Sequence, residues 1–181
     1  NVLVDPNSGS VGMNADICLV PSADNKMDLK NCGRVFDWPG EYETKDIPIT
    51  AFQAWTKAKS KEEEDNKSPE TLIFCFEVGG VKFCHLGELG HTLTSDMVNE
   101  IGDVDILMAK FGEGSNLDLK KGMEVIEAIE PRVVVTLGEK TTVALAKEVG
   151  TDNIEHVEKF VLKSSSELPE DKMRYISISQ S

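Results

Sequence analysis

The sequence predicts a mixed α/β (α+β) fold in which sheets stack in layers and helices cover their outer faces. Three observations indicate this fold class. The first half reads as short strands separated by turn residues. The second half alternates apolar strand-like runs with amphipathic helical segments. One of these runs, RVVVTL at 132–137, is almost wholly apolar, which is typical of a strand covered on both faces.

The first half is expected to form strands bounded by Asn, Gly, Ser, Asp or Pro, at 2–5, 17–20, 33–38 and 47–52. The stretch PGEYE at 39–43 is read as a turn between strands. The segment 71–87 is the clearest hairpin, because two apolar runs flank Gly79-Gly80, a pair suited to a tight turn with positive φ. The segment 56–70 is almost wholly charged and polar, and we expect an exposed acidic loop there.

The second half is expected to contain helices between further strands. Thr94 can cap a helix that stops at Gly102. The segment 118–130 carries apolar residues on one helical face, and 141–150 reads as a short helix that starts at a Thr and ends at a Gly. The strands are expected at 104–111, 132–137, 159–163 and 173–179. No repeat or linker divides the chain, so one domain over 1–181 is predicted.

Charge and cysteine content limit the classes of function. A formal net charge of −13 and a pI near 4.6 disfavour nucleic acid and anionic membranes as partners. No apolar run approaches the roughly 18 to 20 residues that span a bilayer. None of the four cysteines belongs to a C-x-x-C pair, and we read them as reduced core thiols of a cytoplasmic protein. They are Cys18, Cys32, Cys75 and Cys84.

Six stretches, taken together and in order, resemble the metallo-β-lactamase-fold hydrolases, within them the small lactonase-like metal-dependent hydrolases. They are VLVDP at 2–6, ADICLV at 15–20, WPGEYE at 38–43 with IPIT at 47–50, HLGELGH at 85–91, GDVDILM at 102–108 and IEPRVVV at 129–135. The resemblance implies a four-layer αβ/βα sandwich that holds zinc or manganese at one edge between two sheets. The family usually has two strands before VLVDP, so the fold is expected to lack its first two strands here.

The first metal-binding turn of that family is not preserved in this sequence. After the second strand, the family has a Thr-His-x-His-x-Asp-His turn. The resemblance places Ser22 and Asp24 at its first two metal-binding His, Lys26 at its Asp and Met27 at its third His. Ser and Met are poor zinc ligands, and an ammonium group both repels a dication and lacks a lone pair to donate.

The remaining positions of the metal site also differ from the family. A further His position falls at Trp55 or Thr56, and the last His position falls at or beside Gly138. The family's Gly-Asp, whose carboxylate bridges the metals, is matched by Gly87-Glu88. The resemblance therefore leaves a vestigial pocket without imidazole ligands.

Our first interpretation is a metal-free, catalytically degenerate protein with a binding or structural role and no cofactor. In this interpretation Lys26 takes over the charge of the metal and compensates Glu88, because an unpaired buried charge is costly. His85 and His91 are expected to hydrogen-bond the backbone or to line the pocket.

The alternative is a metal-dependent hydrolase with a non-standard carboxylate site. Asp24, Asp28, Glu88 and, less directly, Glu139 could gather oxygen ligands for Mg²⁺ or Mn²⁺. A third possibility is docking of a protein partner, or of a second copy, through the acidic loop or an exposed sheet edge.

Overall fold

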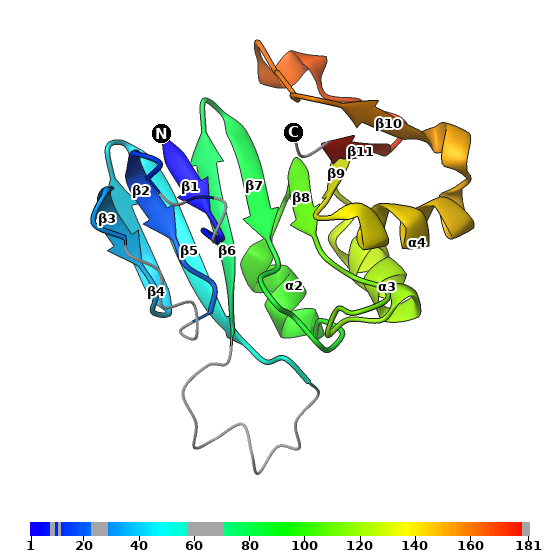
Figure 1. The fold of residues 1–181 in the computed structure, drawn as a ribbon, viewed down its shortest axis with the longest axis horizontal. Helices are drawn as coiled ribbons and strands as arrows, with labels where there is room; N and C mark the ends of the chain where they lie inside the picture. The colour runs from blue at the N-terminus through cyan, green and yellow to red at the C-terminus, as the bar shows by residue number, and fades with distance from the viewer. Residues whose placement is uncertain (8–9, 11, 23–28, 58–70, 179–181) are drawn as a thin grey trace.

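The computed structural model describes residues 1–7, 10, 12–22, 29–57 and 71–178, and they form two sheets with helices (Figure 1). The smaller sheet has the order β1-β2-β3 and is parallel throughout. Its strands are β1 (Val2–Val4), β2 (Ala15–Leu19) and β3 (Cys32–Phe36).

The larger sheet has eight strands in the order β10-β11-β9-β8-β7-β6-β5-β4. These strands are β4 (Gly40–Thr44), β5 (Ile47–Ala54), β6 (Thr71–Val78), β7 (Val81–His85), β8 (Ile106–Ala109), β9 (Val133–Thr136), β10 (Ile154–Val157) and β11 (Arg174–Ile178). The strands from β7 to β10 pair in parallel, whereas β4, β5, β6 and β7 pair antiparallel. The parallel half matches the strand–helix alternation of the second half of the sequence.

The larger sheet is buried on both faces, as the apolar run at 132–137 predicts. Cys84, Leu107 and Val134 lie in register across β7, β8 and β9 and belong to the core beneath the helices. On the opposite face, Phe74 of β6 packs with Ile17 of the small sheet. The period of two along each strand therefore builds two separate cores, one on each side of the sheet.

Three α-helices are described, and each begins and ends close to the predicted residues. The helix α2 (Ser95–Ile101) is capped by Thr94 and ends at Gly102. The helix α3 (Leu119–Ile129) is capped by the Asp118 side chain, which accepts a hydrogen bond from the backbone N–H of Lys121. The helix α4 (Glu139–Val149) begins two residues earlier than predicted, after Gly138 at φ 89°.

The layered mixed α/β fold is the predicted fold class. Apolar residues of all three helices pack on the same face of the large sheet. The small sheet covers part of the other face, and the segment with Phe160, Leu162 and Leu168 covers the rest (Figure 1). A helix on the outer face of the small sheet, the fourth layer of the predicted sandwich, is not found among the described residues.

Two of the predicted elements are wrong. PGEYE is a strand and not a turn: β4 pairs with β5, and the chain reverses at Lys45 and Asp46, both at positive φ. The strand predicted at 159–163 does not form. Phe160 and Leu162 lie in an irregular segment that follows the strand β10. Their side chains pack against the core on the face of the large sheet opposite the helices. The alternation of apolar residues at 159–163 correctly predicted that the side chains of Phe160 and Leu162 are partly buried, but it did not establish that the backbone pairs with another strand.

The prediction that all four cysteines are reduced is wrong for two of them. Cys18 and Cys32 form a disulfide between β2 and β3, with their Cα atoms 6.0 Å apart. The two cysteines are not register partners, because Cys18 lies opposite Val35 and Cys32 lies opposite Ala15, so neither local spacing nor strand register signals the bond. Cys75 and Cys84 are free. The predicted cytoplasmic location therefore loses part of its basis.

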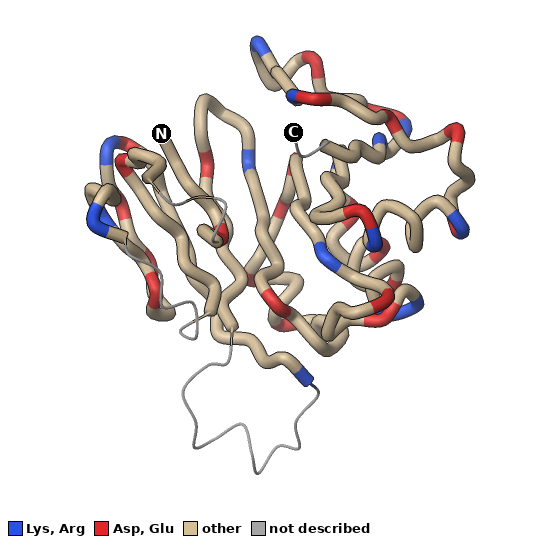
Figure 2. The backbone as a smooth tube through the Cα atoms, in the orientation of Figure 1, with Lys and Arg blue, Asp and Glu red and all other residues tan. Residues whose placement is uncertain are grey.

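None of the described helices is long and apolar enough to cross a membrane. The predicted acidic loop falls mostly on residues 58–70, which lie outside the described residues. Within the part of the chain coloured by charge, Lys and Arg are scattered among Asp and Glu along the backbone (Figure 2).

Candidate functional site

The carboxyl ends of strands from both sheets meet at one edge of the molecule. The strands β5, β7, β8 and β9 run in the same direction, because β6 is antiparallel to both of its neighbours. The carbonyl of Pro21, just past β2, accepts a hydrogen bond from the N–H of Leu72 at 2.8 Å. This contact joins the end of β2 to the start of β6, which lies at that same edge. Ligands of α/β proteins commonly bind at such an edge.

The turn after β7 is fixed by close contacts and by a glycine. The N–H of Gly87 donates to Nδ1 of His85 at 3.0 Å, and the N–H of Glu88 donates to Oγ1 of Thr71 at 2.9 Å. Gly87 has φ 57°, and a Cβ placed there would lie 2.5 Å from the carbonyl oxygen of Leu72. Only glycine fits this turn without strain, so the turn sets the direction of the Glu88 side chain.

His85 is a buried hydrogen-bond acceptor. Its side chain is 2% exposed. Burial, helped by the nearby charge of Lys110, lowers the pKa of His85 to about 4. The imidazole is therefore neutral near pH 7 and accepts the Gly87 N–H through Nδ1.

Glu88 is paired with a lysine. The Nζ of Lys110, one residue past β8, lies 2.7 Å from Oε1 of Glu88. The side-chain amide of Asn116 donates to Oε2 of Glu88 at 3.3 Å and to its backbone carbonyl at 3.2 Å. Both carboxylate oxygens of Glu88 therefore have a donor from the segment that follows β8.

A second carboxyl group lies within electrostatic range of this pair. Asp5 follows β1, and its N–H donates to the carbonyl of Leu19 at 2.9 Å. Burial and, next, the charge of Glu88 raise the pKa of Asp5, while Lys110 opposes this shift. Two carboxyl groups and one ammonium group therefore share the sheet edge, and we call Asp5, Glu88 and Lys110 the charged cluster.

The predicted site residues are only partly placed by the structure. Ser22 is described and half-buried just past β2. Trp55 follows β5, with its ring centroid 6.0 Å from that of His91. Gly138 precedes α4, and a Cβ added there would have no atom within 4 Å. Asp24, Lys26, Met27 and Asp28 lie outside the described residues, so the predicted pairing of Lys26 with Glu88 stays a prediction.

The expectation for the two histidines is confirmed. His91 accepts a hydrogen bond from the backbone N–H of Trp55 through Nε2 at 3.4 Å, and its Nδ1 lies 2.8 Å from the carbonyl of Thr92. This pattern requires the tautomer with the proton on Nδ1. Together with His85, His91 hydrogen-bonds the backbone beside the strand ends.

The residues missed from sequence are Asp5, Lys110 and Asn116. Lys110 lies 22 residues from Glu88 along the chain, and Asn116 lies 28 residues from it. No local spacing connects positions so far apart. One signal was available, because Asp5 and Lys110 are charged residues directly after apolar runs, where strand ends meet.

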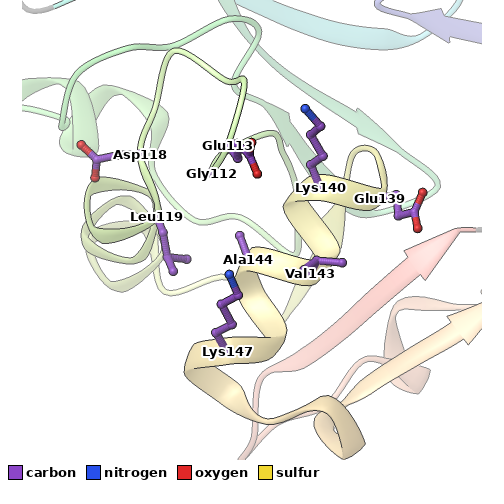
Figure 3. Close-up of a pocket in the computed structure, with 9 residues that line it drawn as sticks. All are labelled: Gly112, Glu113, Asp118, Leu119, Glu139, Lys140, Val143, Ala144 and Lys147. Carbon is purple, nitrogen blue, oxygen red and sulfur yellow. The ribbon is translucent and has the colours of Figure 1, made fainter.

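A cleft lies between the segment after β8 and the helix α4 (Figure 3). Its volume is about 460 Å³, which is within the range of small-molecule pockets. Figure 3 shows Ala144 and Lys147 of α4 on one side, and Asp118 and Leu119 at the start of α3 on the other. The lining residues are Gly112, Glu113, Asp118, Leu119, Glu139, Lys140, Val143, Ala144 and Lys147. The segment that carries Asn116 to Glu88 therefore also forms a wall of this cleft.

The donor groups at the sheet edge do not fit the metal that the fold family implies. The described residues contain no group of three or more His, Cys, Asp and Glu side chains that could hold a metal ion. Zinc sites are built largely from imidazole and thiolate donors, with carboxylates as further ligands. Nδ1 of His85 already accepts a hydrogen bond from the Gly87 N–H, and Oε1 of Glu88 already accepts one from the ammonium group of Lys110. A dication at Glu88 would meet a positive charge already bound there.

Comparisons with known proteins agree with this fold. A UPF0173 metal-dependent hydrolase of Carboxydothermus hydrogenoformans is 24% identical over 111 residues. That match covers 61% of this chain and 49% of the relative, so the chain spans about half the length of the curated relative it matches.

Two solved structures show the same architecture. One, from Thermotoga maritima, is named as a Zn-dependent hydrolase of the metallo-β-lactamase superfamily. It superposes with a TM-score of 0.72 at 24% identity, over 98% of this chain and 90% of its own. Another, from Parabacteroides distasonis, is named as a metal-dependent hydrolase, with a TM-score of 0.53 at 14% identity over 82% of this chain and 81% of its own. At these identities the likeness shows the fold.

The family itself is shown by a match along most of the chain. Residues 1–137 match the family model described as the beta-lactamase superfamily domain. This match and the sandwich of two sheets lead to one conclusion: the chain belongs to the beta-lactamase superfamily and has the metallo-β-lactamase fold.

Proposed function

We propose that this chain is a metal-free, catalytically degenerate member of the superfamily that binds a ligand or a partner and does not hydrolyse a substrate. The observation that carries the proposal is the ion pair between Glu88 and Lys110 at 2.7 Å. Glu88 holds the place of the family's metal-bridging carboxylate, and a lysine of the same chain supplies the positive charge beside it.

Electrostatics supports this exchange of a metal for a lysine. Asp5 and Glu88 repel each other at the sheet edge, and a cation must lie near them to offset the repulsion. The ammonium of Lys110 is covalently tethered, so it is present at every metal concentration. It accepts no electron pair and cannot activate water as a metal ion does. In this proposal, the charged cluster balances the charges at this edge of the sheets without a metal ion.

The cleft between the segment after β8 and α4 is the place where we expect a small ligand. Its wall is the segment that Asn116 ties to Glu88, so the charged cluster holds this wall in position. A protein partner or a second copy pairing with a sheet edge stays a prediction. The strands β1, β3, β4 and β10 form the ends of the two described sheets.

One observation favours the alternative, a hydrolase that uses a hard cation. Asp5 and Glu88 lie close enough for one charge to raise the pKa of the other group. Paired carboxylates of this kind are typical oxygen ligands of Mg²⁺ and Mn²⁺. The names of the relatives, which are metal-dependent hydrolases, point in the same direction. In this alternative, Lys110 would have to leave Glu88 when the cation binds.

Metal titration separates the two functions. We expect the purified chain to carry far less than one zinc or manganese ion per molecule by elemental analysis. Lys110→Met exposes the carboxylates, so its affinity for Mn²⁺ by calorimetry should rise about tenfold or more, or 1.4 kcal/mol. Lys140→Met, a lysine of the cleft wall, is the matched control and should bind as weakly as the unmodified chain. A stoichiometric, tightly held ion in the unmodified chain would refute the metal-free function.

A further inference from the structure

The hairpin of β6 and β7 places two free thiols opposite each other. Its turn at 79–80 has two residues, with φ 61° and 75°. Positive φ at both positions is typical of a type I′ turn, which closes a hairpin without a bulge. The register runs continuously from Val78↔Val81 back to Cys75↔Cys84. The two cysteines are therefore direct cross-strand partners, and both are free.

The position of this pair in the ladder follows from counting residues from the turn. The pair that flanks a two-residue turn is hydrogen-bonded, and bonded and non-bonded pairs alternate beyond it. The pair of Cys75 and Cys84 is the third step from the closing pair, so it is a non-hydrogen-bonded pair. The backbone of Lys82 agrees: its N–H and C=O both bond to Asp105, at 2.9 Å each, on the side away from β6. Cys84, two residues further along β7, points its backbone groups the same way.

A non-hydrogen-bonded pair brings its side chains close enough for a disulfide. The Cα atoms of such a pair lie about 4.5 Å apart, inside the range of about 4.4–6.8 Å found for disulfides. Both cysteines point to the helix-covered face of the sheet. A hydrogen bond that the Cys84 thiol donates to Cys75 and, next, burial raise the pKa of Cys84 well above its usual range. The two cysteines are therefore direct neighbours across the strands, on the same face of the sheet.

We propose that Cys75 and Cys84 form a dithiol site, which low-molecular-weight disulfides such as glutathione disulfide oxidise to a second disulfide of this chain. The Cys75 thiolate attacks one sulfur of glutathione disulfide, which forms a mixed disulfide and releases one glutathione thiolate. The Cys84 thiol then loses its proton and attacks the Cys75 sulfur, and the second glutathione leaves. Two protein thiols are oxidised, and one glutathione disulfide is reduced to two glutathione molecules.

Burial sets the order of these two steps. Cys75 is half-buried and can meet a small disulfide, whereas Cys84 is 0% exposed and cannot. The raised pKa of Cys84 leaves little thiolate for the second step. Its place directly opposite Cys75 compensates for this deficit, because the attack is intramolecular. The mixed disulfide on Cys75 should therefore appear first and then disappear.

The test is oxidation of the whole folded chain, with its Cys18–Cys32 bond intact, by glutathione disulfide. The free thiols in acid-quenched samples are counted, and the modified cysteines are located by mass spectrometry of peptides. The two free thiols should fall to none, with a transient glutathione adduct on Cys75 and a final peptide cross-link between Cys75 and Cys84. Cys84→Ser should stop at one stable glutathione on Cys75. Cys75→Ser, changed at a half-buried position, should take up none.

The unmodified chain decides the matter without the variants. The proposal is overturned if the adduct on Cys75 persists while the Cys84 thiol stays free, or if Cys75 links two chains. It is equally overturned if the folded chain loses no thiol while the same chain in urea reacts. This inference does not depend on the proposed function, because neither cysteine belongs to the charged cluster.

Discussion

The charged cluster joins residues that are far apart in the sequence, and a short strand precedes each of them. Asp5, Glu88 and Lys110 follow β1, β7 and β8, so the folding of two sheets assembles the cluster. The Lys110 Nζ and the Glu88 carboxylate are both partly exposed, so their pairing alone contributes about 1 kcal/mol or less. At the scale of the residue, the charged cluster balances the charges of Asp5, Glu88 and Lys110 more than it adds to the stability of the fold.

A pH dependence follows from His85. Its pKa falls from 6.5 in the unfolded chain to about 4 in the folded chain, mainly through burial. Between these two values the unfolded chain binds a proton that the folded chain does not, so stability decreases as the pH falls from 6.5 to 4. The loss should be about 3 kcal/mol in urea unfolding. His85→Asn, which keeps an acceptor for Gly87, should lack this part of the slope.

His156 provides the control for this prediction, because it is exposed on β10. His156→Asn should keep the full slope between pH 6.5 and pH 4. An equal slope in His85→Asn and in the unmodified chain would show that His85 does not titrate as its burial requires.

The turn after β7 is the element on which the site depends most directly. In this turn the Glu88 N–H donates a hydrogen bond to Thr71 and the Gly87 N–H donates one to His85, and a Cβ at Gly87 would disturb both.

Helix starts and stops could be predicted from caps, as Thr94 and Gly102 show. The strand at 159–163 was wrongly predicted, because burial of alternating side chains does not require a paired backbone.

Two glycine substitutions separate conformational strain from crowding in this turn. Gly87 and Gly79 have nearly the same φ, 57° and 61°, but only Gly87 has atoms within 4 Å of an added Cβ. Gly79→Ala should cost about 1 kcal/mol through its positive φ alone. Gly87→Ala should cost about 2–4 kcal/mol, because the new methyl group also collides with the Leu72 carbonyl and Thr71. Guanidinium unfolding of both variants measures the difference, and equal losses would show that the turn can relax.

At the scale of the molecule, the order of motifs predicted the fold well, because each motif is local and lies at a strand or its end. The Gly-Glu turn singled out Glu88, which the structure places beside Lys110 and Asn116, and its role in a site stays a prediction. Lys110, Asp5 and the partner of Cys18 could not be predicted, since the tertiary fold decides which residues distant in the sequence meet. The pairing of Lys26 with Glu88 stays a prediction, because Lys26 lies outside the described residues.

The small sheet should depend on its disulfide more than on its core. It has three short strands, and Cys18 and Cys32 join two of them across a separation of 14 residues. Closing a loop of that length in the unfolded chain is worth about 3 kcal/mol in the chain-entropy account. Reduction should therefore lower the free energy of unfolding by about 2–4 kcal/mol in urea titrations with and without a phosphine reductant. The double variant Cys18→Ser, Cys32→Ser should unfold like the reduced chain and ignore the reductant. If reduction leaves the unfolding curve unchanged, the packing of Ile17 and Leu19 on the large sheet holds the two sheets together without the bond.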